Sequence, residues 1–144
     1  MARPEKVVVD ASVAFKWFTE EQDSDAARKL IVDYGGGLID IASVELLIFE
    51  VLNALRYAPD IGVEDLKTAA LSLDKLGLDL RPLRDDLAAR CVENTLKYGI
   101  SVYDSSYLSL GELEDLSVYT ADAKLIRKVG GSILKHISSY VNLN

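Results

Sequence analysis

The sequence predicts an α/β fold, a three-layer α/β/α sandwich built on a mostly parallel central sheet. Two observations lead to this prediction. Short apolar segments alternate along the chain with amphipathic segments, and the links are short, which is typical of a parallel sheet with helices on both faces. The chain has 144 residues, of which 49% are hydrophobic and 27% charged, a composition typical of a globular protein. We therefore expect residues 1–144 to form a single domain with its own core.

The predicted strands are short and rich in apolar and β-branched residues. They cover residues 6–10, 38–42, 78–82, 117–120 and 132–136. The first of them reads KVVVD and contains three consecutive valines, as expected for a strand that is buried on both faces of the sheet.

Helices are predicted between these strands from the spacing of apolar residues and from the glycines and Pro59 that follow them. They cover residues 12–19, 24–34, 44–57, 63–76, 85–98, 104–114 and 122–129. Asp104 and Asp122 open the last two, and aspartate is a favoured residue at a helix N-terminus. We therefore expect Asp104 to cap its helix.

Composition excludes several classes of protein. Cys91 and His136 are the single cysteine and histidine, which excludes an internal disulfide and a Cys/His zinc site. No apolar run approaches the roughly 20 residues of a membrane span, and the N-terminus lacks the long apolar region of a secretory signal. We therefore expect a cytoplasmic protein without membrane association. The net charge of −7 counts against RNA as a partner and favours cation binding or a basic protein partner.

Two aspartates are predicted to lie at the same edge of the sheet. Asp10 ends the first strand, and Asp122 follows the strand SVYT by two residues. In a parallel α/β sheet, ligands bind beyond the carboxyl ends of the strands, so these side chains can share a site. The alternative is that Asp10, Asp104 and Asp122 act only as helix caps.

Glu50 has the sequence surroundings of a functional carboxylate. Its helix reads VELLIFEVLNALRY, and its neighbours at helical spacing are mostly apolar. A carboxylate that is buried there has to be neutralised, paired or bound to a metal ion. The alternative is an edge position that reaches water, with Arg56 or Lys16 nearby.

Four carboxylates brought together would repel one another unless a cation is bound. Oxygen ligands without cysteine or histidine select a hard divalent ion. The sequence therefore predicts a Mg²⁺ or Mn²⁺ site formed by Asp10, Glu50, Asp104 and Asp122.

Four segments resemble, in order, the motifs of PIN-domain nucleases, and above all those of the VapC-type toxins of toxin–antitoxin pairs. These segments are VVVDASVAFKW, FEVLNAL, VYDSSYLSLG and YTADAKL. The resemblance implies a PIN-like domain in which the same four carboxylates hold the metal, with support from Ser12, Asn53 and Thr120. One departure is that IASVELL lacks the proline that usually precedes the glutamate-bearing helix.

The same resemblance implies a function and partners. The expected activity is that of a Mg²⁺- or Mn²⁺-dependent endoribonuclease that leaves 5′-phosphate and 3′-hydroxyl ends. The expected partners are the RNA substrate, a second copy in a homodimer and a VapB-like antitoxin laid over the acidic groove. Candidate cations for holding RNA are Lys16, Arg56, Lys97, Lys124, Arg127 and Lys128.

Two alternatives keep the PIN-like fold, namely a housekeeping RNA-processing nuclease and a non-catalytic binding module. Two others do not fit. A receiver domain would carry two adjacent acids after the first strand, where this chain has one. A phosphatase of the haloacid dehalogenase type would carry an aspartate two residues after Asp10, where this chain has Ser12.

Overall fold

The computed structural model describes residues 3–141. These residues form a five-stranded sheet in the order β3-β2-β1-β4-β5, and every neighbouring pair of strands is parallel. The strands are β1 (Glu5–Val9), β2 (Ile39–Val44), β3 (Asp79–Arg81), β4 (Val118–Thr120) and β5 (Leu134–His136). The predicted parallel α/β architecture is confirmed.

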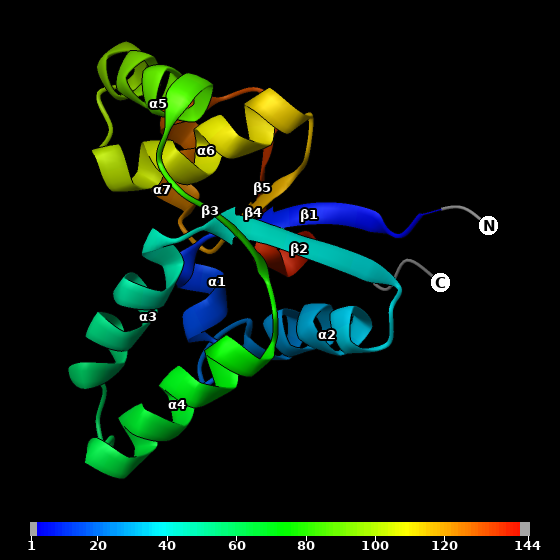
Figure 1. Ribbon diagram of the computed structural model, residues 1–144, viewed down its shortest axis with the longest axis vertical. Coiled ribbons are helices and arrows are strands. Elements are labelled where there is room, and N and C mark those ends of the chain that lie inside the picture. The colour runs from blue at the N-terminus through cyan, green and yellow to red at the C-terminus, as the bar shows by residue number, and fades with distance from the viewer. Residues whose placement is uncertain (1–2, 142–144) are drawn as a thin grey trace.

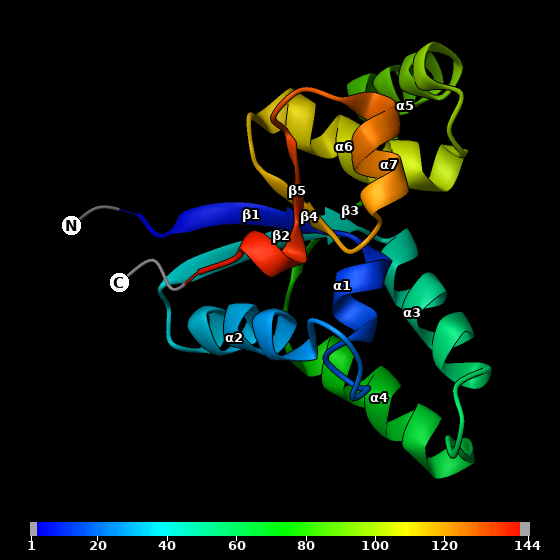
Figure 2. The same ribbon diagram turned by 180° about the vertical axis from the view of Figure 1, so that it is seen from behind.

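The helices cover both faces of this sheet. They are α1 (Ala11–Phe15), α2 (Ser24–Gly35), α3 (Leu46–Arg56), α4 (Val63–Lys75), α5 (Asp85–Tyr98), α6 (Val102–Glu114) and α7 (Ala123–Val129), with a short 3-10 helix, η1 (Ile137–Ser139). Figures 1 and 2 show α5, α6 and α7 on one face, and α1, α2, α3 and α4 on the other. No helix within residues 3–141 combines the length and apolar character needed to cross a membrane.

The core lies on both sides of the central strand β1. Val7, Val8 and Val9 are all buried, as the uninterrupted apolar run predicts. Helix α6 packs closely on β4 because Gly111 has no side chain. A Cβ atom there would overlap Val118 Cγ2 and lie 2.9 Å from the carbonyl oxygen of Leu116. This close approach fixes the position of α6, which carries Asp104.

Several helix boundaries differ from the prediction, and α1 ends at Phe15 and not at residue 19. The starts of α3 and α6 differ for identifiable reasons. Val44 belongs to β2 because it pairs with Arg81 of β3, so α3 begins only at Leu46. Helix α6 begins at Val102, because the Ser101 side chain accepts a hydrogen bond from the backbone N–H of Asp104 at 3.0 Å. Asp104 therefore does not cap α6, and the predicted cap is wrong. Capping of α6 therefore does not account for a carboxylate at position 104.

Candidate active site

Asp10 lies where β1 ends and α1 begins. Its Oδ1 atom accepts hydrogen bonds from the Ser12 hydroxyl at 2.6 Å and from the backbone N–H of Val13 at 3.3 Å. Asp10 is thus the N-cap of α1, as the simplest interpretation of the sequence proposed. Its side chain is nevertheless buried among the ends of the strands, with the residue only 6% exposed. The capping role and a place in a site are therefore compatible.

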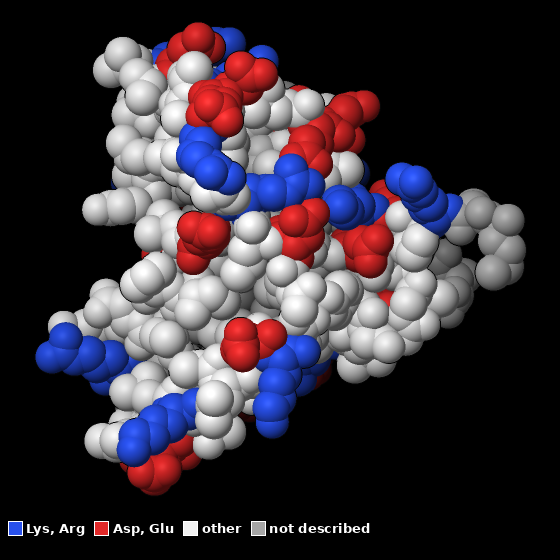
Figure 3. Space-filling model, in the orientation of Figure 1, with Lys and Arg blue, Asp and Glu red and all other residues white. Residues whose placement is uncertain are grey.

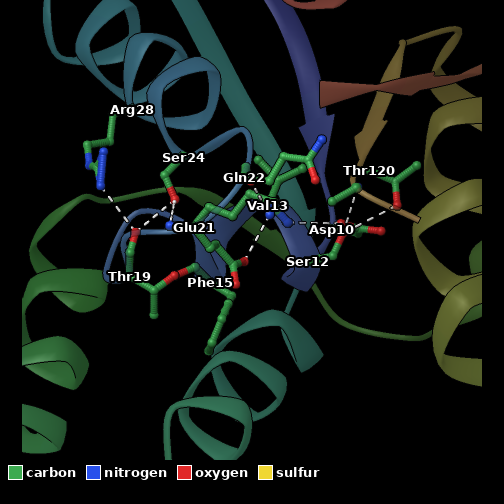
Figure 4. A network of polar contacts seen from close by, with 12 residues as sticks. Asp10, Ser12, Val13, Phe15, Thr19, Glu21, Gln22, Ser24, Arg28 and Thr120 are labelled. Carbon is green, nitrogen blue, oxygen red and sulfur yellow. Dashed lines mark hydrogen bonds and ion pairs between the residues drawn. The ribbon is translucent and has the colours of Figure 1, made fainter. Parts of the chain in front are cut away.

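Two hydroxyl groups join the end of β1 to the end of β4 (Figure 4). Ser12 Oγ accepts a hydrogen bond from the backbone N–H of Ala121 at 2.8 Å and lies 3.3 Å from Thr120 Oγ1. Thr120 Oγ1 in turn accepts one from the backbone N–H of Asp122 at 3.1 Å. These bonds place the residues before Asp122 against the loop that carries Asp10. Asp122 itself caps α7 through the N–H of Leu125.

The aspartates at this edge affect one another's ionisation. Burial raises the pKa of Asp10 to about 6, although hydrogen bonds from Ser12, Thr120 and Val13 oppose the rise, and the charge of Asp104 adds to it. Burial and the charge of Asp122 likewise raise the pKa of Asp104. The three carboxylates therefore form one electrostatically coupled group.

Glu50 joins this group through Tyr107. The phenol of Tyr107 donates a hydrogen bond to Glu50 Oε1 at 2.6 Å. Burial and then the charges of Glu50, Asp10 and Asp104 raise the pKa of Tyr107 far above its usual range. The expected burial of Glu50 is only partial, since its side chain is half-buried, and neither Arg56 nor Lys16 forms an ion pair with it among the described residues.

Sequence reasoning did not assign Tyr107 to the site, although a signal was present. Tyr107 lies three residues after Asp104, so both side chains project from the same face of α6. A buried phenol needs a hydrogen-bond acceptor. The carboxylate of Glu50 on the facing helix α3 supplies it.

Two other predicted residues form no hydrogen bond or ion pair with the four carboxylates among the described residues. Asn53 is exposed on α3, one turn after Glu50. Lys16 is 8% exposed, and its ammonium group binds Glu21 Oε1 at 2.9 Å and the carbonyl oxygen of Gln22 at 2.6 Å. Lys16 therefore fixes the loop before α2, and the expectation that it holds RNA is wrong.

The chemistry of the four side chains fits a hard divalent ion. All donors are carboxylate oxygens, and no lysine or arginine within residues 3–141 forms an ion pair with Asp10, Glu50, Asp104 or Asp122. In the same part of the chain, no three acidic, histidine or cysteine side chains converge into a ready-made metal cage.

Two hollows of different character border the carboxylates. The apolar groove, about 770 Å³, runs between α3 and α4 and is lined by Leu46, Phe49, Glu50, Leu52, Asn53, Arg56, Leu66, Lys67, Ala70 and Tyr103. The charged cleft, about 260 Å³, lies between α6 and α7 and is lined by Asp104, Asp122, Lys124 and Lys128 together with Gly99, Ile100, Ser101 and Leu125. Glu50 thus faces one hollow, and Asp104 and Asp122 face the other.

A parallel α/β fold with coupled carboxylates at its strand ends is the architecture of many phosphate-processing enzymes. The family model described as PIN domain matches residues 7–131, and the chain therefore belongs to the PIN domain family. This confirms the family that the four sequence segments resemble.

Individual relatives narrow the similarity. The chain is 26% identical to "Ribonuclease VapC3" of Pyrobaculum aerophilum over 127 residues, which are 85% of this chain and 94% of the relative. It is 29% identical to "Exonuclease VapC9" of the same organism over 93 residues, 65% of this chain and 70% of the relative. Among solved structures, a chain of a toxin–antitoxin complex from Klebsiella pneumoniae superimposes with a TM-score of 0.69 at 14% identity, covering 91% and 97% of the two chains. The resemblance to VapC-type PIN proteins is thereby confirmed.

Proposed function

We propose that this chain is a Mg²⁺- or Mn²⁺-dependent endoribonuclease and the toxin of a VapBC-type pair. The observation that carries the proposal is the electrostatic coupling of carboxylates from separate parts of the chain, with no ion-paired cation among the described residues. Its curated relatives are named as a ribonuclease and an exonuclease, which supports nuclease chemistry.

Asp10 and Asp104 are the proposed direct ligands of the ion, and Glu50 and Asp122 act through water or on a second ion. A bound divalent ion lowers the pKa of a coordinated water and neutralises charge on the phosphodiester. Ser12 and the Val13 N–H hold the same oxygen of Asp10, Oδ1, which fixes the plane of the carboxylate.

Tyr107 has the corresponding role for Glu50. Its hydroxyl donates a hydrogen bond to Oε1 of Glu50, which orients the carboxylate. Oε2 is then the oxygen that can accept a proton from an attacking water. Because the phenol is buried and surrounded by carboxylates, it stays protonated and remains a donor.

The proposed protein partners are a second copy of the chain and an antitoxin. A net charge of −7 favours a basic antitoxin segment. The apolar groove suits the apolar side chains of such a segment, because Phe49 and Tyr103 are 74% and 58% exposed there and Glu50 continues the groove into the site. The toxin–antitoxin complex among the structural neighbours supports this partner. A short reading frame for a DNA-binding antitoxin is expected beside the gene.

The test is cleavage of end-labelled RNA in Mg²⁺ by the Asp104→Asn variant. We expect a loss of about 100-fold or more, because a ligand and its charge are removed, while thermal unfolding stays unchanged. Asp74→Asn on the exposed face of α4 is the matched control and should cleave like the wild type. Undiminished cleavage by Asp104→Asn, or cleavage that persists in a chelator, would contradict the proposal.

A further inference from the structure

The charged cleft contains two lysines and two aspartates that form no ion pair with one another. Lys124 and Lys128 line it together with Asp104 and Asp122. Within residues 3–141, neither lysine forms an ion pair with a carboxylate, although two carboxylates line the same cleft. The charge of these two lysines is therefore available to a ligand that enters the cleft.

The placement of the lysines on α7 is specific. They are four residues apart, so both lie on the same face of the helix. Lys124 lies in the first turn of α7, where a cation is unfavourable for the helix dipole. A role in stabilising α7 therefore does not explain Lys124.

Lys128 is held in place before any ligand arrives. Its ammonium group donates a hydrogen bond of 2.7 Å to the carbonyl oxygen of Gly99. Gly99 ends α5 with a φ angle of +61°, a conformation that glycine adopts without strain. An ammonium group has three donors, so this bond leaves two for a ligand.

We infer that Lys124 and Lys128 bind the backbone phosphate of single-stranded RNA next to the phosphodiester that the carboxylates cleave. This inference rests on the proposed function, because it names how the same site holds its substrate. The chemistry is that of an anion on two ammonium groups, beside carboxylates that would repel it without the lysines. The lysines are positioning residues for the substrate and take no part in proton transfer.

The inference accounts for RNA binding by an acidic protein. A chain with a charge of −7 repels RNA on average, so local cations must provide the attraction. Of the candidate cations, Lys16 is buried and paired, and Arg56 faces the apolar groove. Lys124 and Lys128 share a hollow with two of the site carboxylates.

The test compares two double variants that remove the same charge. Lys124→Ala/Lys128→Ala removes the pair in the cleft, and Lys29→Ala/Lys75→Ala removes two exposed lysines on α2 and α4. Binding of a short fluorescein-labelled oligouridylate is followed by fluorescence anisotropy, with a chelator present to prevent cleavage. The measurement is repeated between about 50 and 200 mM salt.

We expect the cleft variant to bind about tenfold more weakly. The slope of log K against log salt concentration should fall by about 0.7, since the one phosphate contact that is lost contributes about that much on a single strand. The control should bind like the wild type, and Lys124→Arg/Lys128→Arg should restore most of the affinity because the charge is kept. In Mg²⁺ the KM of the cleft variant should rise while kcat is retained.

Equal weakening in both double variants, or none in the cleft variant, would overturn the inference. For the wild type, RNA binding is measured with a chelator and RNA cleavage is measured in Mg²⁺, so the two proposals can fail separately. Binding that depends on the cleft lysines, without cleavage by the wild type, would contradict the proposed nuclease and retain the subsite. RNA cleavage with the same KM in the wild type and the cleft variant would retain the proposed nuclease and overturn the lysine subsite. Absence of RNA binding by the wild type would overturn both proposals.

Discussion

Asp10 directly follows β1 and Asp79 begins β3 of the same sheet, but the pKa values of the two carboxylates are shifted in opposite directions. Hydrogen bonds from Arg81, together with Lys6, lower the pKa of Asp79 to about 2 despite partial burial. Burial raises the pKa of Asp10 to about 6, and no cation is paired with it among the described residues. The charge of Asp79 is thus neutralised within the fold, whereas the charge of Asp10 remains available to a ligand.

Helix α6 connects the two regions. Its first turn carries Asp104 toward the carboxylate group, and Glu114 at its last residue forms an ion pair with Arg81. Arg81 therefore bridges Asp79 and Glu114, and this network ties β3 to the end of α6. The ion-pair network has a structural role, whereas the carboxylate group has properties suited to binding a metal ion.

The largest expected effect comes from neutralising Asp10. Asp10→Asn should lower RNA cleavage by about 100-fold or more, because a proposed ligand loses its charge. Its melting temperature in a chelator should stay the same or rise, because an amide keeps the cap on Val13 and removes an uncompensated buried charge. Calorimetry and the cleavage assay together check both statements. A marked loss of stability would contradict the assignment of this charge to function.

The next effect is expected at Gly111, which acts on both regions because it positions α6. Gly111→Ala places a methyl group against Val118 and the Leu116 carbonyl, so the helix has to move away from β4. We expect the free energy of unfolding to fall by about 2 kcal/mol, and cleavage to fall with it. Urea denaturation measures the change. Wild-type stability in this variant would show that the close packing of α6 is not needed.

A smaller effect is expected from Asp79→Asn, the counterpart of Asp10→Asn. The side chain of Asp79 is 41% exposed, so solvent screens its ion pairs, and we expect a loss below about 1 kcal/mol. RNA cleavage should be unaffected, since the network does not contact the carboxylate group. The cleavage assay and urea denaturation measure these two effects. Impaired cleavage in a folded Asp79→Asn variant would contradict the purely structural role of the ion-pair network.

The smallest expected effect is a dependence of stability on pH. The pKa of Asp79 is about 2 in the folded protein, below its ordinary value of 3.8. Its contribution to stability is therefore complete above about pH 4 and is lost as the pH falls through about 2. The stability difference between the wild type and Asp79→Asn should narrow over that interval in urea titrations. A difference that stays constant would contradict the role of the ion pairs.

The sequence predicted the sheet and the common edge of Asp10 and Asp122 because strand ends are local features with a fixed consequence in a parallel fold. It misplaced the cap at Asp104, although Ser101 stands three residues earlier and competes for the same role. It could not place Lys16, whose direction depends on the loop at Glu21 and Gln22. The hydrogen bond between Tyr107 and Glu50 joins residues 57 positions apart, which no local pattern reveals.

The most direct test of the central claim is a crystal of the wild-type protein soaked in Mn²⁺, with the ion located by its anomalous scattering. The claim is that the uncompensated carboxylates at the strand ends are there to bind a divalent ion. The predicted result is manganese bound between Asp10 and Asp104, with Ser12 still hydrogen-bonded to Asp10. Manganese bound only elsewhere, or absent from these carboxylates at saturating concentration, would contradict the claim.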